Sequence, residues 1–141
     1  MKKLISLSVL ALLVISFFTV SSIAANKKAQ TAVSKSAKVE VYYFHFTRRC
    51  VTCQAVETET QKSILALYPH QAKKGFITFK SINLDEKSSE AIAAKCKAEG
   101  QSLLITSSNK RVDLTDKAFM YAKSNPVKLK AELKKTIDPL F

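Results

Sequence analysis

Two cysteines separated by two residues, Cys50 and Cys53, constrain this sequence more than any other feature. A β-branched and aromatic run, 39–46, precedes them, and a stretch typical of a helix, 54–68, follows them. The partial positive charge of a helix N-terminus favours the thiolate, which is the form that attacks disulfides and binds soft metal ions. The order of strand, short loop, CxxC and helix therefore predicts a cysteine pair that alternates between dithiol and disulfide.

The rest of the chain predicts an α/β fold with a central four-stranded mixed sheet flanked by helices. Three further strands are indicated by apolar and β-branched runs, at 76–84, 103–106 and 111–114. Apolar residues at helical spacing predict helices over 54–68, 89–98 and 125–140. The predicted order is β-α-β-α-β-β-α.

Two segments of this pattern have weaker signals. Pro69 is expected to end the first helix, because a proline cannot continue one. Residues 115–124 predict no more than a helical turn.

The first 25 residues have the three parts of a secretory signal peptide. The first three residues are basic, 4–20 is largely apolar, and Ser22 and Ala24 provide the small residues of a cleavage site. An uncleaved N-terminal anchor is the alternative, but this apolar segment is short for a membrane span. We therefore expect the protein to be exported, to the periplasm or another extracytoplasmic compartment of a bacterium.

Residues 26–38 are polar and basic and are expected to form a flexible linker, which leaves 39–141 as one domain. The formal net charge is +12, but the lysines are spread along the chain and form no arginine-rich block. This spacing predicts a solvated surface and no binding to nucleic acid. A membrane is expected as a partner only through an uncleaved signal segment, and the domain is expected to be a monomer.

Over about residues 39–140 the chain resembles thioredoxin-like proteins, because a βαβ unit followed by a ββα unit is the order of the thioredoxin fold. The segment 79–85 is also similar to the thioredoxin strand that ends in Asn-x-Asp. A closer resemblance is to the nitrophenyl compound nitroreductase subunit ArsF-like family of bacteria. It is carried by Tyr42-Tyr43-Phe44-His45, Arg49-Cys50-Val51-Thr52-Cys53, Phe79-Lys80-Ser81-Ile82-Asn83, Gly100-Gln101-Ser102-Leu103, Val112-Asp113-Leu114-Thr115, Phe119-Met120-Tyr121-Ala122 and Asn125-Pro126.

The family label implies a link to nitroreduction. The sequence indicates no flavin or nicotinamide site, so no cofactor is expected and that activity is not carried over.

The chain departs from ordinary thioredoxins at five positions. Arg49 stands where tryptophan is usual before the first cysteine, and Val51-Thr52 replaces Gly-Pro between the cysteines. Ser102 is the position that matches the cis-proline of the family, and Phe44 occupies the position of its buried acid. These departures put ordinary thioredoxin-type reductase activity in doubt.

The roles of the site residues follow from their positions. Cys50 is the expected nucleophile at the helix start, and Cys53, one turn further on, is the expected resolving thiol. Arg48 and Arg49 are expected to lower the pKa of Cys50. His45 is a candidate base or hydrogen-bond partner for the thiols, although a partly buried histidine at a strand end is the simpler interpretation.

The sequence thus predicts a possible thiol-disulfide oxidoreductase whose partners are protein thiols or disulfides. One alternative is a protein that binds a soft metal or metalloid through the same two thiols. Another is an accessory subunit with no turnover. Cys96 is expected to be a small buried residue in a helix, and no set of four metal ligands is indicated.

Overall fold

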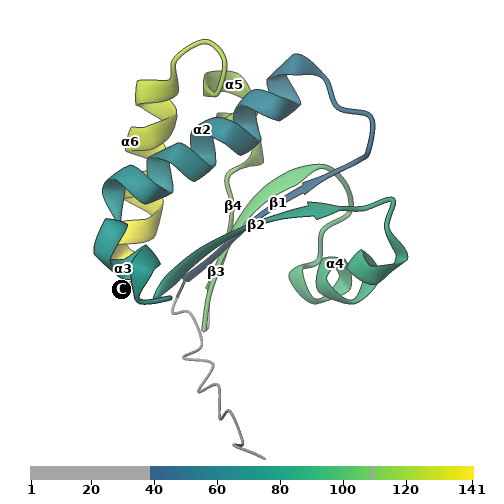
Figure 1. Ribbon diagram of the computed structural model, residues 1–141, viewed down its shortest axis with the longest axis horizontal. Helices are drawn as coiled ribbons and strands as arrows, with labels where there is room; N and C mark the ends of the chain where they lie inside the picture. Colours follow the sequence, from purple (N-terminus) through teal and green to yellow (C-terminus); the bar gives the residue numbers. More distant parts are fainter. Residues whose placement is uncertain (1–38, 109) are drawn as a thin grey trace, which may run out of the picture. The chain divides into compact units, whose positions relative to one another are not determined.

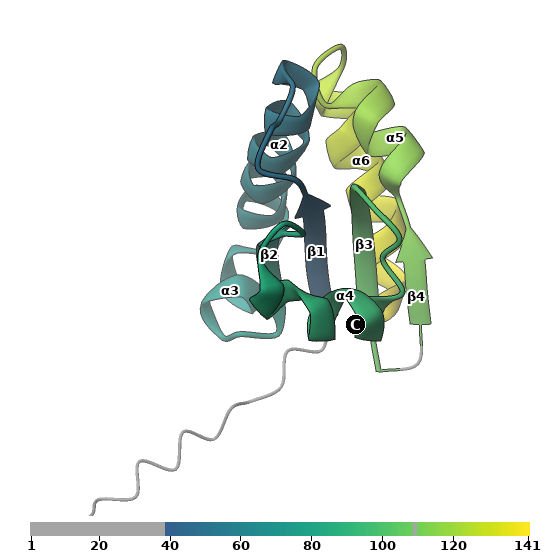
Figure 2. The same ribbon diagram turned by 90° about the vertical axis from the view of Figure 1, so that its right-hand side faces the viewer.

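A computed structural model describes residues 39–108 and 110–141 of the chain. The expected signal peptide, 1–25, and basic linker, 26–38, lie outside these residues. The described part is built on one four-stranded sheet with the strand order β2-β1-β3-β4 (Figure 2). The strands are β1 (Val39–His45), β2 (Ile77–Asn83), β3 (Ser102–Ser107) and β4 (Lys110–Asp113).

The sheet is mixed, with one parallel and two antiparallel pairs of strands. β1 runs parallel to β2, with Val39 opposite Ile77, and antiparallel to β3, with Phe44 opposite Ser102. β4 pairs with β3 in the antiparallel sense. β1 lies between two strands and is covered on both faces, and accordingly six of its seven residues are buried and five of these are apolar.

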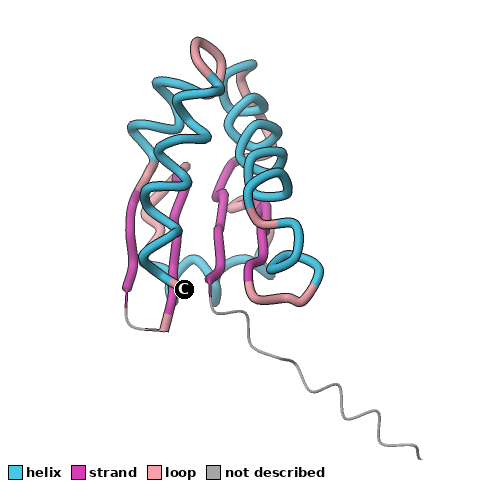
Figure 3. Tube along the Cα trace, turned by 90° about the vertical axis from the view of Figure 1, so that its left-hand side faces the viewer, coloured by secondary structure: helices cyan, strands magenta, loops and turns pink. Residues whose placement is uncertain are grey.

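Helices cover both faces of the sheet, as Figures 1 and 3 show. α2 and α6 lie on one face, and α4 lies on the other (Figure 1). The helices are α2 (Val51–Leu67), α3 (Pro69–Lys73), α4 (Glu90–Cys96), α5 (Thr115–Tyr121) and α6 (Pro126–Ile137), with short 3₁₀ turns η2 (Lys87–Ser89) and η3 (Asp138–Leu140).

The alternation of side chains along β1 divides the interior into two hydrophobic clusters. Val41 and Tyr43 point to the side of α2, α5 and α6, where the larger cluster lies. Tyr42 and Phe44 point to the opposite side and pack with Leu104 and residues of α4. The larger cluster also contains Val56 and Ile64 of α2 and Leu129, Leu133 and Ile137 of α6.

The order of elements and the sense of each strand pair define a thioredoxin fold, which confirms the predicted fold class. A βαβ unit supplies the parallel strands β1 and β2, and a ββα unit supplies β3, β4 and the last helices. None of the helices in the described ranges is long and apolar enough to cross a membrane.

Four local features differ from the sequence prediction. α2 begins at Val51, between the two cysteines, because Cys50 is its N-cap residue. Pro69 begins the short helix α3, since a proline is well tolerated in the first turn. Residues 115–121 form the full helix α5. The first strand ends at His45, and Phe46 lies in the following loop with 42% of its surface exposed.

Candidate redox site

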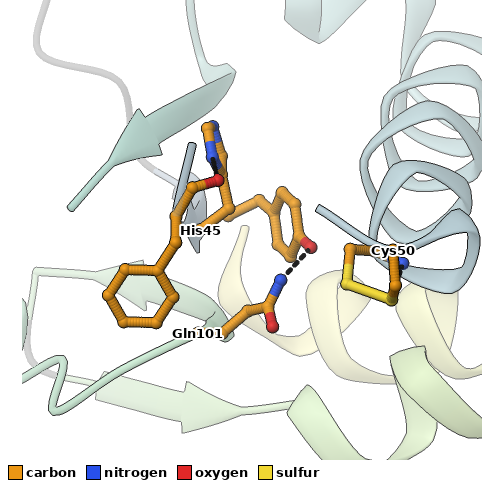
Figure 4. The surroundings of a disulfide bond; sticks show 6 residues. His45, Cys50 and Gln101 are labelled. Atoms are coloured by element: carbon orange, nitrogen blue, oxygen red, sulfur yellow. Dashed lines mark hydrogen bonds between the residues drawn. A yellow bond between two sulfur atoms is a disulfide. The ribbon is translucent and has the colours of Figure 1, made fainter. Parts of the chain in front are cut away.

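Cys50 and Cys53 form a disulfide at the start of α2 (Figure 4). Their Cα atoms are 5.1 Å apart, a separation that suits such a bond. The Cys50 sulfur accepts a hydrogen bond from the backbone N–H of Cys53 at 3.2 Å, so it caps the helix. Cys50 is exposed, whereas only 5% of Cys53 is exposed. The helix terminus therefore presents one sulfur to solvent and keeps the other inside.

The loop that leads to Cys50 is fixed to the end of β2. The Asp85 carboxylate accepts a hydrogen bond from the Thr47 N–H at 2.7 Å, and the Asn83 amide donates to the Thr47 hydroxyl at 3.0 Å. The backbone and side-chain hydrogen bonds from Thr47 hold the pKa of Asp85 below its usual range. The Asn-x-Asp segment at the end of the second strand thus anchors the loop that carries the cysteine pair.

The two arginines before Cys50 have different surroundings. Arg48 is exposed, whereas Arg49 is half-buried and forms an ion pair with Glu57 of α2. Glu57 lies seven residues after Cys50 and four after Cys53, on the same side of the helix as both. Its negative charge offsets much of the positive charge that Arg49 brings to the site, which the sequence prediction did not include.

His45 ends β1 and is buried, with 7% of its surface exposed. Its Nδ1 lies 2.9 Å from the carbonyl oxygen of Phe46, to which it donates when that nitrogen carries the proton. In Figure 4 the imidazole points away from Cys50. It lines a cavity of about 400 Å³ together with Asn83, Glu86 and Ser89. The geometry supports the simpler interpretation, a buried histidine at a strand end.

Ser102, which was expected from the sequence to stand where thioredoxins have their cis-proline, is the first residue of β3. Its hydroxyl donates to the carbonyl of Gly100 at 3.0 Å, and it lies opposite Phe44 in the sheet. No peptide bond among residues 39–108 and 110–141 is cis. The preceding residue, Gln101, donates from its side-chain amide to the hydroxyl of Tyr43 at 3.2 Å.

Cys96 lies on the other face of the sheet from the helix that carries the cysteine pair. It is the last residue of α4, is buried, and packs with Tyr42 and Phe44 on the opposite face of the sheet from α2. Burial raises the pKa of its thiol, which therefore stays protonated. Among the described residues no group of three or more histidine, cysteine, aspartate and glutamate side chains could hold a metal ion.

The residues around the pair that the sequence interpretation missed are Glu57, Tyr43 and Gln101. Glu57 could have been found from helical spacing, because residues four apart on a helix lie side by side. Tyr43 was expected only in the sheet core, and its bond to Gln101 joins residues 58 positions apart. No local pattern indicates a contact of that kind.

Together, the strand topology and the bonded cysteines define a thioredoxin-fold protein with a CxxC disulfide at the start of its first described helix. No protein-family model matches the chain, and no curated protein does either. Among solved structures, the chain is similar to the oxidised form of mitochondrial thioredoxin 3 from Saccharomyces cerevisiae, with 19% identity and a TM-score of 0.44. That match covers 72% of this chain and 81% of the yeast protein. The fold assignment rests on the strand order and pairing and not on this similarity.

Proposed function

We propose that the protein exchanges thiols and disulfides through Cys50 and Cys53. The observation that carries the proposal is the pairing of an exposed sulfur at the helix N-cap with a buried sulfur one turn inside, on a thioredoxin fold. An exposed sulfur can meet a partner protein, and a buried one can reach only its neighbour. This asymmetry suits a nucleophile followed by a resolving thiol.

The exchange proceeds in two balanced steps. In the reduced protein, the Cys50 thiolate attacks a substrate disulfide, a bond forms between Cys50 and one substrate sulfur, and the other substrate sulfur leaves as a thiolate. Cys53 then loses its proton and attacks the Cys50 sulfur, which releases the second substrate sulfur. Two electrons pass from the cysteine pair to the substrate, and the proton that Cys53 loses ends on one of the two released substrate sulfurs, while the other leaves as a thiolate.

The chain supplies three influences on the Cys50 thiolate. The start of α2 provides partial positive charge and the Cys53 N–H, which donates to the Cys50 sulfur. Arg48 adds a full positive charge in an exposed position. Arg49 adds less, because Glu57 neutralises it. We therefore assign the stabilisation of the thiolate mainly to the helix terminus, and to Arg49 only a smaller part.

The test uses residues 26–141 of the chain, reduced and mixed with a disulfide-bonded protein. Cys50→Ser should abolish exchange, and Cys53→Ser should accumulate a mixed disulfide between Cys50 and the substrate, visible by mass spectrometry. Cys96→Ser is the matched control and should exchange at the wild-type rate, because Cys96 is buried on the other face of the sheet. Failure of the wild type to exchange, or equal mixed-disulfide formation in Cys50→Ser, would exclude the proposal.

The same proposal places the exchange outside the cytoplasm, as the signal-like first 25 residues and the CxxC pair suggest together. Membership of the ArsF-like family is supported by the sequence pattern alone, and we propose no nitroreductase activity for this chain. The reduction potential of the Cys50–Cys53 couple would give the direction of exchange. A value close to thioredoxin, about −270 mV, would indicate a reductant, and one close to DsbA, about −120 mV, an oxidant.

A further inference from the structure

A buried hydroxyl group lies beside the cysteine pair. Tyr43 has none of its surface exposed and points to the α2 side of the sheet. Its hydroxyl accepts a hydrogen bond from the side-chain amide of Gln101, which precedes β3. Figure 4 shows this hydrogen bond as a dashed line in the surroundings of the disulfide. The bond lies between His45 and Cys50 in that view.

This hydroxyl has an unused hydrogen-bond donor. A phenol can donate one hydrogen bond and accept others, and the bond from Gln101 uses it as an acceptor. Within the described ranges, no hydrogen bond uses the Tyr43 proton. A buried donor without a partner is unfavourable, which indicates that this donor serves a group that appears in another state of the site.

We propose that the Tyr43 hydroxyl, held by Gln101, donates a hydrogen bond to the thiolate of Cys53 during the second step of exchange. This inference rests on the proposed function. Cys53 is almost fully buried, so its thiolate cannot be stabilised by water. A hydrogen bond to the charged form favours that form, and thus lowers the pKa of the resolving thiol. Tyr43 accordingly acts directly on the attacking sulfur, as a hydrogen-bond donor to its thiolate.

The groups around Tyr43 keep its hydroxyl protonated. Burial raises the pKa of the Tyr43 phenol, and the negative charge of Glu57 adds to this effect. The bond from Gln101 and the charge of Arg49 act in the opposite direction but do not reverse it. The imidazole of His45 packs against the ring, with 5.7 Å between the centroids. The phenol therefore remains a donor across the range in which thiols titrate.

The step balances without a proton from Tyr43. The Cys53 thiol gives its proton to the released substrate thiolate, the Cys53 thiolate attacks the Cys50 sulfur, and the bond between Cys50 and the substrate breaks. Tyr43 keeps its proton throughout and supplies only the hydrogen bond. Removal of the hydroxyl should consequently slow the second step and leave the first step unchanged.

Stopped-flow reaction of the reduced protein with the disulfide 5,5′-dithiobis(2-nitrobenzoate) separates the two steps. The first phase releases one thionitrobenzoate as Cys50 is modified, and the second phase releases another as Cys53 displaces it. In Tyr43→Phe, we expect the pH midpoint of the second phase to rise by about one unit. At pH 7 that phase should slow about threefold, since the greater nucleophilicity of a more basic thiolate offsets part of the tenfold loss of thiolate.

Tyr42→Phe is the matched control, because Tyr42 is the adjacent tyrosine of β1 and packs on the α4 face with Cys96. It should leave both phases unchanged. Gln101→Leu keeps the Tyr43 hydroxyl but removes the amide that hydrogen-bonds to it. This variant should shift the pH midpoint of the second phase in the same direction as Tyr43→Phe, by a smaller amount.

An unchanged second-phase midpoint in Tyr43→Phe would overturn the assignment of Tyr43. If that variant does not fold, an unchanged midpoint in Gln101→Leu overturns it instead. If the wild-type protein shows no second phase, Cys53 does not displace the thionitrobenzoate from Cys50. That result would overturn the proposed exchange itself, and the role of Tyr43 with it.

Discussion

At the scale of single residues, the Arg49–Glu57 ion pair sets the charge beside the cysteines. Both side chains are about one-quarter exposed, so their interaction is only partly screened by solvent. Glu57→Gln leaves the positive charge of Arg49 without its partner. We expect the pKa of the Cys50 thiol to fall by about half a unit, which is about 0.7 kcal/mol of added stabilisation of its thiolate and is within the range of partly exposed charge interactions.

The measurement is the pH dependence of alkylation by iodoacetamide in the Cys53→Ser background, where Cys50 is the accessible thiol. Glu59→Gln is the control, since Glu59 lies on the same helix but pairs with Lys62. A Cys50 pKa that is unchanged or higher in Glu57→Gln would contradict this account of the charge.

Asp85 makes the loop before Cys50 sensitive to acid. Hydrogen bonds from Thr47 lower the pKa of Asp85 in the folded protein. The stabilisation from these bonds is therefore fully present above the ordinary pKa of about 3.8, and it is lost as the pH falls through the lowered pKa of the folded state. The amide proton shift of Thr47 in an NMR titration should follow this ionisation, with a midpoint below 3.8. Asp85→Asn should abolish the titration, whereas Asp116→Asn, at an exposed site on α5, should preserve it.

At the scale of elements, the start of α6 shows how a cap contributes to stability. The Asn125 side chain accepts a hydrogen bond from the Lys128 N–H at 3.0 Å, and Pro126 occupies the first turn. Asn125→Ala should lower the free energy of unfolding by about 1 kcal/mol in urea titrations, because the N–H loses its partner. Lys123→Ala, in the exposed segment just before, should change it by less than about 0.5 kcal/mol. Equal effects would indicate that the cap is not used.

The sequence predicted the elements whose signals are local. β1 has a nearly continuous apolar run, and α6 has both an N-cap and a periodic stripe, so both were found close to their observed bounds. α3 was missed because Pro69 both prevents α2 from continuing and begins the next helix. α5 has only one buried residue, Ala118, and so carries little periodicity.

In the candidate site, too, the features encoded by a local pattern were predicted and the contacts between distant residues were not. The CxxC pair at a helix start is a local pattern and was found. The ion pair between Arg49 and Glu57 crosses from the loop to the second turn of α2, and the bond between Gln101 and Tyr43 crosses between strands. Helical spacing places Glu57 beside the cysteines, although not its pairing with Arg49. The bond between Gln101 and Tyr43 depends on the three-dimensional arrangement, which spacing along the chain does not encode.

At the scale of the whole molecule, the two faces of the sheet differ in how much they bury. The face covered by α2, α5 and α6 holds the larger cluster of buried residues, including Leu129, Leu133 and Ile137. The other face is covered by the seven-residue helix α4 and a small cluster around Tyr42. Because local stability follows buried apolar contact, we expect α4 to open separately from the rest of the fold.

Native-state hydrogen exchange tests this expectation. The α4 amides should exchange with a lower opening free energy than those of α2 and α6, which should exchange only on global unfolding. Leu133→Ala should reduce the protection of α2 and α6 by about 2–5 kcal/mol, because it leaves a cavity in the larger cluster. Leu133→Ala should leave the protection of the α4 amides unchanged, as long as the free energy of global unfolding stays above that of the local opening of α4. Ile92→Ala, on α4, should lower α4 protection with a smaller effect on α6. If all helices lost protection together in both variants, the sheet would unfold as one unit, and the redox site on α2 would share its stability with the α4 face.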